Sequence, residues 1–368
     1  MHVFACAGCD ATLTVPLSEV CLPVHARQQY GNGAQLPVLM ESGTFASDPD
    51  PWGGPWRLWD GLEPGEAEAR GVHAPVHALS RRTAGAFVIA PGDLRGTRIM
   101  PENGGGSCCG LDGADGPNTA CEACDLPVAA RIDDCSLWQA VRLGTDTVRR
   151  VPVEGADPAP LPWTELAESG ERTALFEPIA TWGGGLGPSH YWSWSPRWEA
   201  AAGHALAHLL VASEGRPVDV PDGLTAEVFR RALDALLPAG PPRRRAVLAG
   251  PGLPSPDPDG AVLLVPIHPR TGRTWTPEGP AASAYPVPLP LGVWLGLVSP
   301  RPYRPVPASG GIPRDVLRDE PLPPRPGRLF RADRGTFQHT LVRLPAVRSP
   351  WMRAILKKLA SRRAADLF

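Results

Sequence analysis

Two stretches of this sequence, far apart along the chain, carry the same spacing of two cysteines, an aspartate and an apolar residue. Residues 6–13 are Cys-Ala-Gly-Cys-Asp-Ala-Thr-Leu, and residues 121–128 are Cys-Glu-Ala-Cys-Asp-Leu-Pro-Val. A Cys-x-x-Cys turn presents two thiolates to one tetrahedral ion, and the apolar residue that follows begins a strand beneath it. Two such turns predict one metal site with four cysteine ligands: Cys6, Cys9, Cys121 and Cys124.

Zinc is the ion that this ligand set favours, because four soft thiolates impose tetrahedral geometry without a redox liability. The paired turns resemble a zinc ribbon, although 111 residues separate Cys9 from Cys121, far more than ribbons usually have between their turns. A site with four cysteine ligands is coordinatively closed. The zinc expected here is therefore structural and has no open position for chemistry.

A second arrangement of the cysteines stays open. Three further cysteines lie near the second turn and could close a local site with it. The first turn would then bind a second metal or none, and reduced cysteines without any metal are a third alternative. Cys21 is expected in the hydrophobic core. The cysteines of the local alternative are Cys108, Cys109, Cys121, Cys124 and Cys135.

The region around the second turn resembles proteins of high-GC bacteria that are known only as uncharacterised. The resemblance rests on residues 108–118, Cys-Cys-Gly-Leu-Asp-Gly-Ala-Asp-Gly-Pro-Asn, and on residues 131–139, Arg-Ile-Asp-Asp-Cys-Ser-Leu-Trp-Gln. It covers at most the first 150 residues. It implies a cysteine-rich, zinc-ribbon-like N-terminal part and brings no function with it.

Cysteine usage and apolar patterning also bear on cellular location. Eight cysteines in 368 residues are too few for a disulfide scaffold and too clustered for random core positions. The first residues lack the basic segment and long apolar run of a signal peptide. The longest nearly apolar stretch, residues 284–298, is too short and too rich in proline to span a bilayer. We therefore expect a cytoplasmic protein without a transmembrane segment.

The distribution of cysteine, aromatic, proline and basic residues along the chain predicts an α+β fold in four parts. An irregular, β-rich, zinc-stabilised module at residues 1–150 contains all eight cysteines. An aromatic-rich module of helices and strands follows at residues 151–298. Half of the 46 prolines lie between residues 238 and 328, and a Pro/Arg-rich linker is expected at residues 299–328. Residues 329–368 form a basic C-terminal segment with an amphipathic helix.

Periodicity and capping residues predict individual elements within these parts. The apolar face of the C-terminal helix is expected at Trp351, Met352, Ile355, Leu356 and Leu359, with Ser349 as its cap and Pro350 as its first residue. The other expected helices are residues 136–143, 197–213 and 225–237, the last capped by Thr225. The expected strands are residues 12–17, 86–90, 261–267 and 291–298, those among the prolines mostly at sheet edges.

Charge and motif content limit the possible functions. The net charge of −2 divides into 18 acidic and 11 basic residues in positions 1–150, against 20 and 25 in positions 151–368. A net charge this small gives a weak electrostatic field, which argues against a dedicated nucleic-acid binder. Nucleic acid remains an alternative partner because of the ribbon and the basic C-terminal third of the chain. The C-terminal helix could also contact an anionic membrane peripherally. Packing of that helix on its own core is preferred.

An enzyme is the other alternative, and it would use the Gly/Cys/Asp-rich loop 104–135 with histidines in a cleft. His204 and His208 share a helix face, but Ala205 replaces the glutamate of an H-E-x-x-H zinc protease. Packing and turn formation are the preferred roles of the candidate groups, and the leading function is a zinc-stabilised interaction or regulatory protein with a protein partner. The candidate groups are His73, His77, His204, His208, Asp112, Asp115, Asp133 and Asp134.

Overall fold

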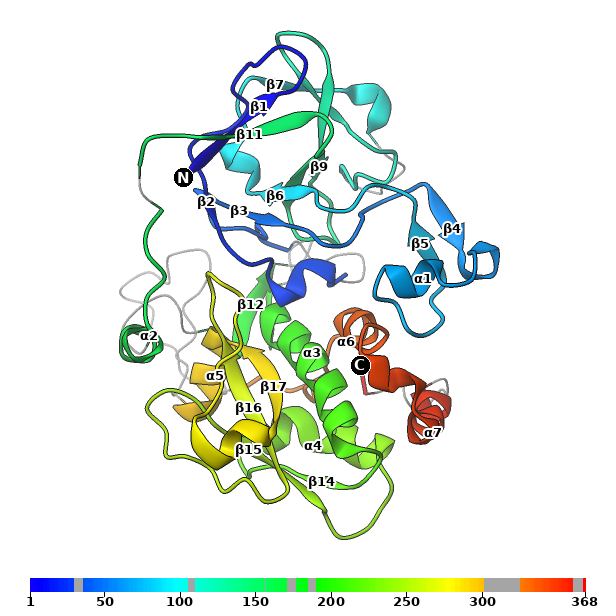
Figure 1. Ribbon diagram of the computed structural model, residues 1–368, viewed down its shortest axis with the longest axis vertical. Helices are drawn as coiled ribbons and strands as arrows, with labels where there is room; N and C mark the ends of the chain where they lie inside the picture. Colours follow the sequence, from blue (N-terminus) through cyan, green and yellow to red (C-terminus); the bar gives the residue numbers. More distant parts are fainter. Residues whose placement is uncertain are drawn as a thin grey trace. The chain divides into compact units, whose positions relative to one another are not determined.

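The computed structural model describes residues 1–29, 36–104, 110–155, 157–170, 177–184, 190–300, 325–359 and 367–368. Helices and strands are mixed, as the sequence predicts, and the chain divides into two compact units (Figure 1). The N-terminal unit is Met1–Pro160 together with Pro269–Gly272, and the C-terminal unit is Leu161–His268 with Arg273–Phe368. No helix among the residues described is long and apolar enough to cross a membrane.

The N-terminal unit is built around a seven-stranded sheet with the strand order β2-β3-β6-β10-β9-β8-β7. Neighbouring strands are antiparallel except for the parallel pair β2 and β3. Strands β1 and β11 form a separate antiparallel pair, and β4 and β5 form a hairpin. The bounds are β1 His2–Cys6, β2 Ser18–Glu19, β3 Thr44–Ser47, β4 Trp56–Leu58, α1 Glu66–Ala69, β5 Ala78–Ser80, β6 Phe87–Ile89, β7 Thr97–Ile99, β8 Thr119–Cys121, β9 Pro127–Ile132, β10 Ala140–Leu143 and β11 Val148–Pro152.

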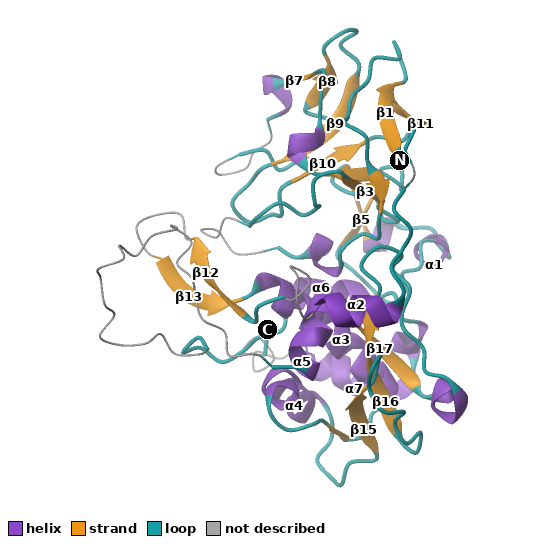
Figure 2. Ribbon diagram, turned by 90° about the vertical axis from the view of Figure 1, so that its left-hand side faces the viewer, coloured by secondary structure: helices purple, strands orange, loops and turns teal. Residues whose placement is uncertain are grey.

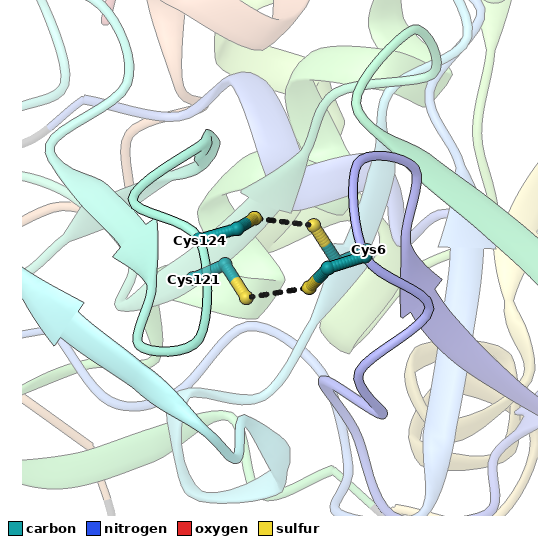
Figure 3. Close-up of side chains that lie close together, drawn as sticks. Cys6, Cys121 and Cys124 are labelled. Atoms are coloured by element: carbon teal, nitrogen blue, oxygen red, sulfur yellow. Dashed lines mark hydrogen bonds between the residues drawn. The ribbon is translucent and has the colours of Figure 1, made fainter.

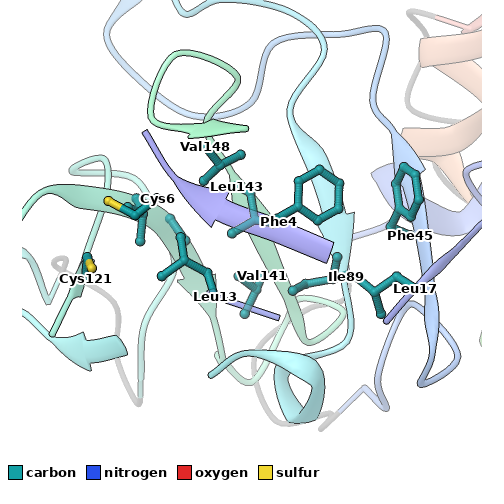
Figure 4. Close-up of a cluster of buried hydrophobic side chains, with 12 residues drawn as sticks. Phe4, Cys6, Leu13, Leu17, Phe45, Ile89, Cys121, Val141, Leu143 and Val148 are labelled. Atoms are coloured by element: carbon teal, nitrogen blue, oxygen red, sulfur yellow. The ribbon is translucent and has the colours of Figure 1, made fainter. Parts of the chain in front are cut away.

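The core of this unit joins the β1–β11 pair to the seven-stranded sheet (Figure 4). Phe4 of β1 meets Phe45 of β3 edge to face, with ring centroids 5.1 Å apart. Side chains from β6 and β10 lie beside these rings, among them Ile89 and Val141. Cys6 and Cys121 belong to the same buried cluster, so the ends of β1 and β8 are fixed by apolar packing.

Two of the expected N-terminal elements differ in the structure. The helix expected at residues 136–143 is wrong, because the chain forms a turn held by the Asp134 carboxylate and then strand β10. Every residue of β10 is buried between β6 and β9, and such a strand has no polar alternation to distinguish it from a helix. Residues 12–17 make isolated bridges only, whereas β6 lies inside the expected strand 86–90.

The C-terminal unit contains four parallel strands in the order β14-β15-β16-β17 and a separate antiparallel hairpin, β12–β13. Figure 2 shows the helices of this unit gathered around strands β15 to β17. Helix α3 packs against both β17 and α6. The bounds are α2 Trp163–Gly170, β12 Ala180–Gly184, β13 His190–Trp194, α3 Pro196–Ser213, β14 Val218–Asp219, α4 Leu224–Leu236, β15 Arg244–Leu248, β16 Ala261–Ile267, β17 Tyr285–Pro290, α5 Leu291–Val298, α6 Arg334–Leu341 and α7 Pro350–Leu359.

The proline-rich region forms more regular structure than its composition suggests. Strand β17 is Tyr-Pro-Val-Pro-Leu-Pro and lies at an edge of the sheet. Proline has no N–H to donate, and at an edge strand every second residue can be proline without the loss of a hydrogen bond to the neighbouring strand. The expected strand 261–267 is confirmed as β16. The strand expected at residues 291–298 is wrong, because these residues form α5, which is apolar on nearly all sides and buried. Residues 301–324, most of the expected linker, lie outside the described residues.

The expected helices of this unit are confirmed with small shifts at their ends. Helix α3 begins at Pro196, and its apolar side is buried as expected. Helix α4 begins at Leu224, so Thr225 is a buried helical residue and Gly223 precedes the helix in place of the expected cap. Helix α7 begins at Pro350 and buries Met352 and Ile355.

Gly203 lets helices α3 and α6 approach closely. A Cβ atom at this position would lie 2.4 Å from the backbone oxygen of Asp333. We therefore expect Gly203→Ala to lower the free energy of unfolding by about 1–3 kcal/mol, the usual cost of overpacking, although alanine itself favours helix. Urea denaturation measures the change. Gly327→Ala is the control, since its added methyl group would meet no atom within 4 Å, and an equal effect in both variants would contradict the prediction.

Candidate metal centre

The first Cys-x-x-Cys turn, here called the first knuckle (Cys6–Asp10), follows directly from strand β1. The Cys6 amide donates to the Ala11 carbonyl over 2.8 Å, and the Asp10 amide donates to the Cys6 carbonyl over 3.0 Å. Asp10 has a φ of 63°, in the left-handed region. Aspartate adopts this conformation more readily than most residues, which gives the aspartate of the repeated motif a physical role.

The second knuckle (Cys121–Asp125) repeats this geometry at the end of strand β8. The Cys121 amide donates to the Leu126 carbonyl over 2.9 Å, and the Asp125 amide donates to the Cys121 carbonyl over 3.0 Å. Asp125 has a φ of 60°. The repeat seen in the sequence is therefore a repeat of backbone conformation.

The two knuckles face each other and form the four-cysteine cluster (Cys6, Cys9, Cys121 and Cys124). Figure 3 shows the Cys6 side chain directed toward that of Cys124. The Sγ atoms of Cys6 and Cys124 are 3.5 Å apart, those of Cys9 and Cys121 are 3.7 Å apart, and all four lie within 4.8 Å of one another. Four sulfurs bound tetrahedrally at about 2.3 Å would be about 3.8 Å apart, so the cluster can hold one metal ion.

Burial differs between the two cysteines of each knuckle. Cys6 and Cys121 are buried at the ends of their strands, whereas Cys9 and Cys124 are exposed. The cluster therefore has one side in the hydrophobic core and the other at the surface of the unit (Figure 4). This placement fixes two ligands through apolar packing and leaves a path by which an ion reaches the other two.

The thiols of the cluster do not ionise independently. Burial raises the pKa of the Cys6 thiol, but hydrogen bonds from the Gly8 amide and the neighbouring thiols outweigh it and lower this pKa to about 7. The Leu126 amide lowers the pKa of Cys124, yet the thiols around it raise that pKa to about 12. Burial raises the pKa of Cys121 as well. Four thiolates at these separations therefore require a cation.

An ion pair lies beside each knuckle. The Arg149 guanidinium of β11 contacts Asp10, and the Arg98 guanidinium of β7 donates to Asp125 over 2.8 Å. Both aspartates directly follow the second cysteine of their knuckle. The pairs are exposed, so each contributes little to stability. They place one guanidinium near each half of a cluster whose four thiolates would carry a net charge of −2 around a divalent ion.

The other candidate cysteines do not join the cluster in the described part of the chain. Cys108 and Cys109 lie outside the described residues. Cys135 is buried, and no group of metal-ligating side chains found among the described residues includes it. Cys21 is partly buried, and its thiol donates to the Pro269 carbonyl over 3.1 Å.

The histidine candidates of the enzyme alternative are divided between the two units, and two of its aspartates have local partners. The Asp112 carboxylate accepts from the Ala114 amide, so it forms a turn as preferred from the sequence, and Asp133 lies 3.8 Å from Arg131. His73 and His77 belong to the N-terminal unit, whereas His204 and His208 belong to the C-terminal unit. Neither unit alone contains all four histidines.

His204 and His208 pack together on helix α3, with ring centroids 4.9 Å apart. Burial, followed by repulsion from His208 and His339, lowers the pKa of His204 to about 3. Burial lowers the pKa of His208 to about 4. Both imidazoles are therefore neutral near pH 7.

The histidine pair predicts an acid-labile C-terminal unit. An unfolded histidine titrates near pH 6.5, so between that pH and the lowered folded pKa values the unfolded state binds more protons. The free energy of unfolding should be fully retained above pH 6.5 and should fall by about 1.4 kcal/mol per pH unit for each histidine below it. Urea denaturation between pH 7.5 and 5 measures this slope.

The double variant His204→Asn/His208→Asn is the comparison protein for the pH series. It keeps the four-cysteine cluster, so acid acts on the thiolates equally in both proteins, and the difference in slope reports the histidine pair. A variant whose stability falls with acid as steeply as that of the wild type would show that these imidazoles do not control the acid response.

A second set of buried charges was not expected from the sequence. The Asp48 carboxylate, directly after β3, accepts from Arg27 and from Arg142 of β10, and all of its side chain is buried. The Trp52 ring lies 4.3 Å from the Arg142 guanidinium carbon. Burial lowers the pKa of Arg142 to about 10 despite its contact with Asp48. Only the rarity of arginine within an apolar run hinted at such a partner.

Comparison with known proteins finds no family model, no curated protein and no solved structure that matches the chain.

Proposed function

We propose that the four-cysteine cluster is a structural zinc site and that the chain is a zinc-stabilised interaction or regulatory protein. The observation that carries the proposal is the pairing of two knuckles of equal backbone geometry around four sulfurs at tetrahedral spacing. Four thiolates fill the coordination sphere of zinc, so the ion would hold β1 against β8 and would take no part in chemistry. A reducing compartment, for which we propose the cytoplasm, would keep these thiols available.

Metal content per chain tests the site. After dialysis against metal-free buffer, we expect one zinc in the wild type and none in Cys6→Ser or Cys121→Ser. Cys21→Ser is the matched control and should keep its zinc, because its thiol lies outside the cluster. Zinc that persists in Cys6→Ser but not in Cys121→Ser would instead favour the local arrangement with Cys108 and Cys109. Iron in place of zinc, or no metal, would contradict the proposal.

A protein partner is favoured by the exposed apolar side chains of strand β4. Trp56 and Leu58 are 59% and 60% exposed and point to the same face of the hairpin, since they are two residues apart. Large apolar side chains that gather at the surface are typical of binding sites. Affinity purification from the protein's own cells should recover a partner that Trp56→Ser/Leu58→Ser loses and Leu329→Ser, at an exposed apolar residue of the other unit, retains.

Many basic residues of the C-terminal unit have internal partners, which disfavours the nucleic-acid alternative. Arg325 and Arg244 contact the carboxylates of Glu227 and Glu214. Lys358 of α7 donates to the carbonyls at the end of α4. A guanidinium that is already paired with a carboxylate is a poor phosphate contact, so we expect no binding to generic DNA or RNA at physiological salt.

A further inference from the structure

A second group of potential ligands lies on helix α3, far along the chain from the cysteines. His204 and His208 are four residues apart, so their side chains leave the same face of the helix. Their ring centroids are 4.9 Å apart, and the rings are inclined by 59°. Neighbouring imidazoles at this spacing on one helix can direct a nitrogen each at a common point.

The Nδ1 atoms of both rings are held by hydroxyl groups from other elements. His204 Nδ1 lies 3.1 Å from Thr340 Oγ1 of α6, and His208 Nδ1 lies 3.3 Å from the Tyr285 hydroxyl of β17. The Thr340 hydroxyl already donates to the Thr336 carbonyl over 2.8 Å, so it must accept from His204. The His204 proton is therefore on Nδ1, which leaves a lone pair on Nε2.

This is the arrangement of metal-binding histidines, in which the nitrogen that does not bind the metal donates to a fixed oxygen and so sets the tautomer. The Tyr285 hydroxyl can accept from His208 in the same way. Neither Nε2 atom makes a hydrogen bond within the described residues. Both side chains keep partial exposure, which gives an ion access to them.

We propose that His204 and His208 bind one borderline divalent cation of the zinc class through their two Nε2 atoms. Imidazole suits zinc, nickel and copper, whereas magnesium and calcium require oxygen ligands. No third histidine, cysteine or carboxylate of the described residues completes a cluster with this pair. Water fills the remaining positions, so this ion is held more weakly than an ion in the four-cysteine cluster and has open coordination sites.

Equilibrium dialysis of the full chain against zinc tests the proposal. With micromolar to millimolar free zinc, we expect two ions per wild-type chain, one of which is lost on dialysis against metal-free buffer. His204→Asn and His208→Asn should each lose the weaker ion and keep the tighter one, because asparagine can replace the Nδ1 contact but has no Nε2. His77→Asn, at an exposed histidine of the other unit, should retain both.

The four-cysteine cluster and the histidine pair are distinguishable in this experiment, because Cys6→Ser should remove only the tight ion. Nitrogen-15 spectra of the wild type need no variant: zinc added after the tight site is filled should shift the Nε2 resonances of two histidines and leave their Nδ1 protons in place. A second ion that is absent at millimolar zinc, or that binds both asparagine variants as it binds the wild type, would overturn the proposal. Unchanged histidine spectra would overturn it as well.

Discussion

Removal of the metal is expected to lower the free energy of unfolding of the N-terminal unit by at least about 4–5 kcal/mol. The reason is that a metal ion held by both knuckles cross-links the chain across a loop of about 100 residues, and such a cross-link lowers the conformational entropy of the unfolded state. Chelation would leave four thiols whose ionisation is mutually unfavourable at the ends of β1 and β8. The buried Cys6 and Cys121 also belong to the core, so the loss extends to their apolar neighbours. Apparent free energies of zinc binding to small domains are larger still, on the order of 10–16 kcal/mol.

Hydrogen exchange with and without chelator locates this effect. Amides of β1, β8 and β11 should exchange faster without metal, whereas α3 and α4 of the other unit should keep their protection. The double variant Cys6→Ser/Cys121→Ser is the control, because chelator should change neither its melting temperature nor its exchange. Equal melting temperatures of the wild type with and without chelator would contradict a structural role for the metal.

Replacement of Asp48 by asparagine should cost on the order of 3–5 kcal/mol, as expected when one partner of a buried ion pair is removed. The variant keeps the shape of the side chain but leaves Arg142, which is 5% exposed, without its carboxylate in the middle of the sheet. Contact with the Trp52 ring offsets part of the loss. The midpoint of urea denaturation measures the change.

Asp222→Asn is the matched control for Asp48→Asn. Asp222 accepts from Arg230 over 2.9 Å, but its side chain is 93% exposed, and exposed pairs contribute about 0–1 kcal/mol. A loss below about 1 kcal/mol in Asp48→Asn would mean that water reaches Arg142 in the folded protein. That outcome would also predict that the pKa of the Arg142 guanidinium is not lowered by burial.

The four-cysteine cluster was predictable because its signal is local. Each Cys-x-x-Cys-Asp stretch fixes its own turn, and a site with four thiolate ligands requires the two turns to meet whatever the length of the loop between them. The structure places the four cysteines together as the repeat predicts. The buried charges around Asp48 had no such signal, because Arg142 is 94 residues from its partner and neither residue belongs to a motif.

Two of the errors in secondary structure share a physical cause. Strand β10 and helix α5 are both buried on nearly all sides, so the alternation of polar and apolar residues that distinguishes strands from helices is absent from each. Helix α7 has an exposed side, and its periodicity predicted its first residue, Pro350. Burial therefore removes the pattern on which prediction depends.

The distance between the knuckles has a consequence for protein synthesis. Cys9 leaves the ribosome 112 residues before Cys121, and at ordinary elongation rates this interval is roughly 5–20 s. During that time only the first knuckle of the four-cysteine cluster is present, so two of its four ligands are missing. Strand β1 must also wait for β11. Capture of a metal ion by the four-cysteine cluster, and pairing of β1 with β11, would therefore follow the synthesis of about 150 residues.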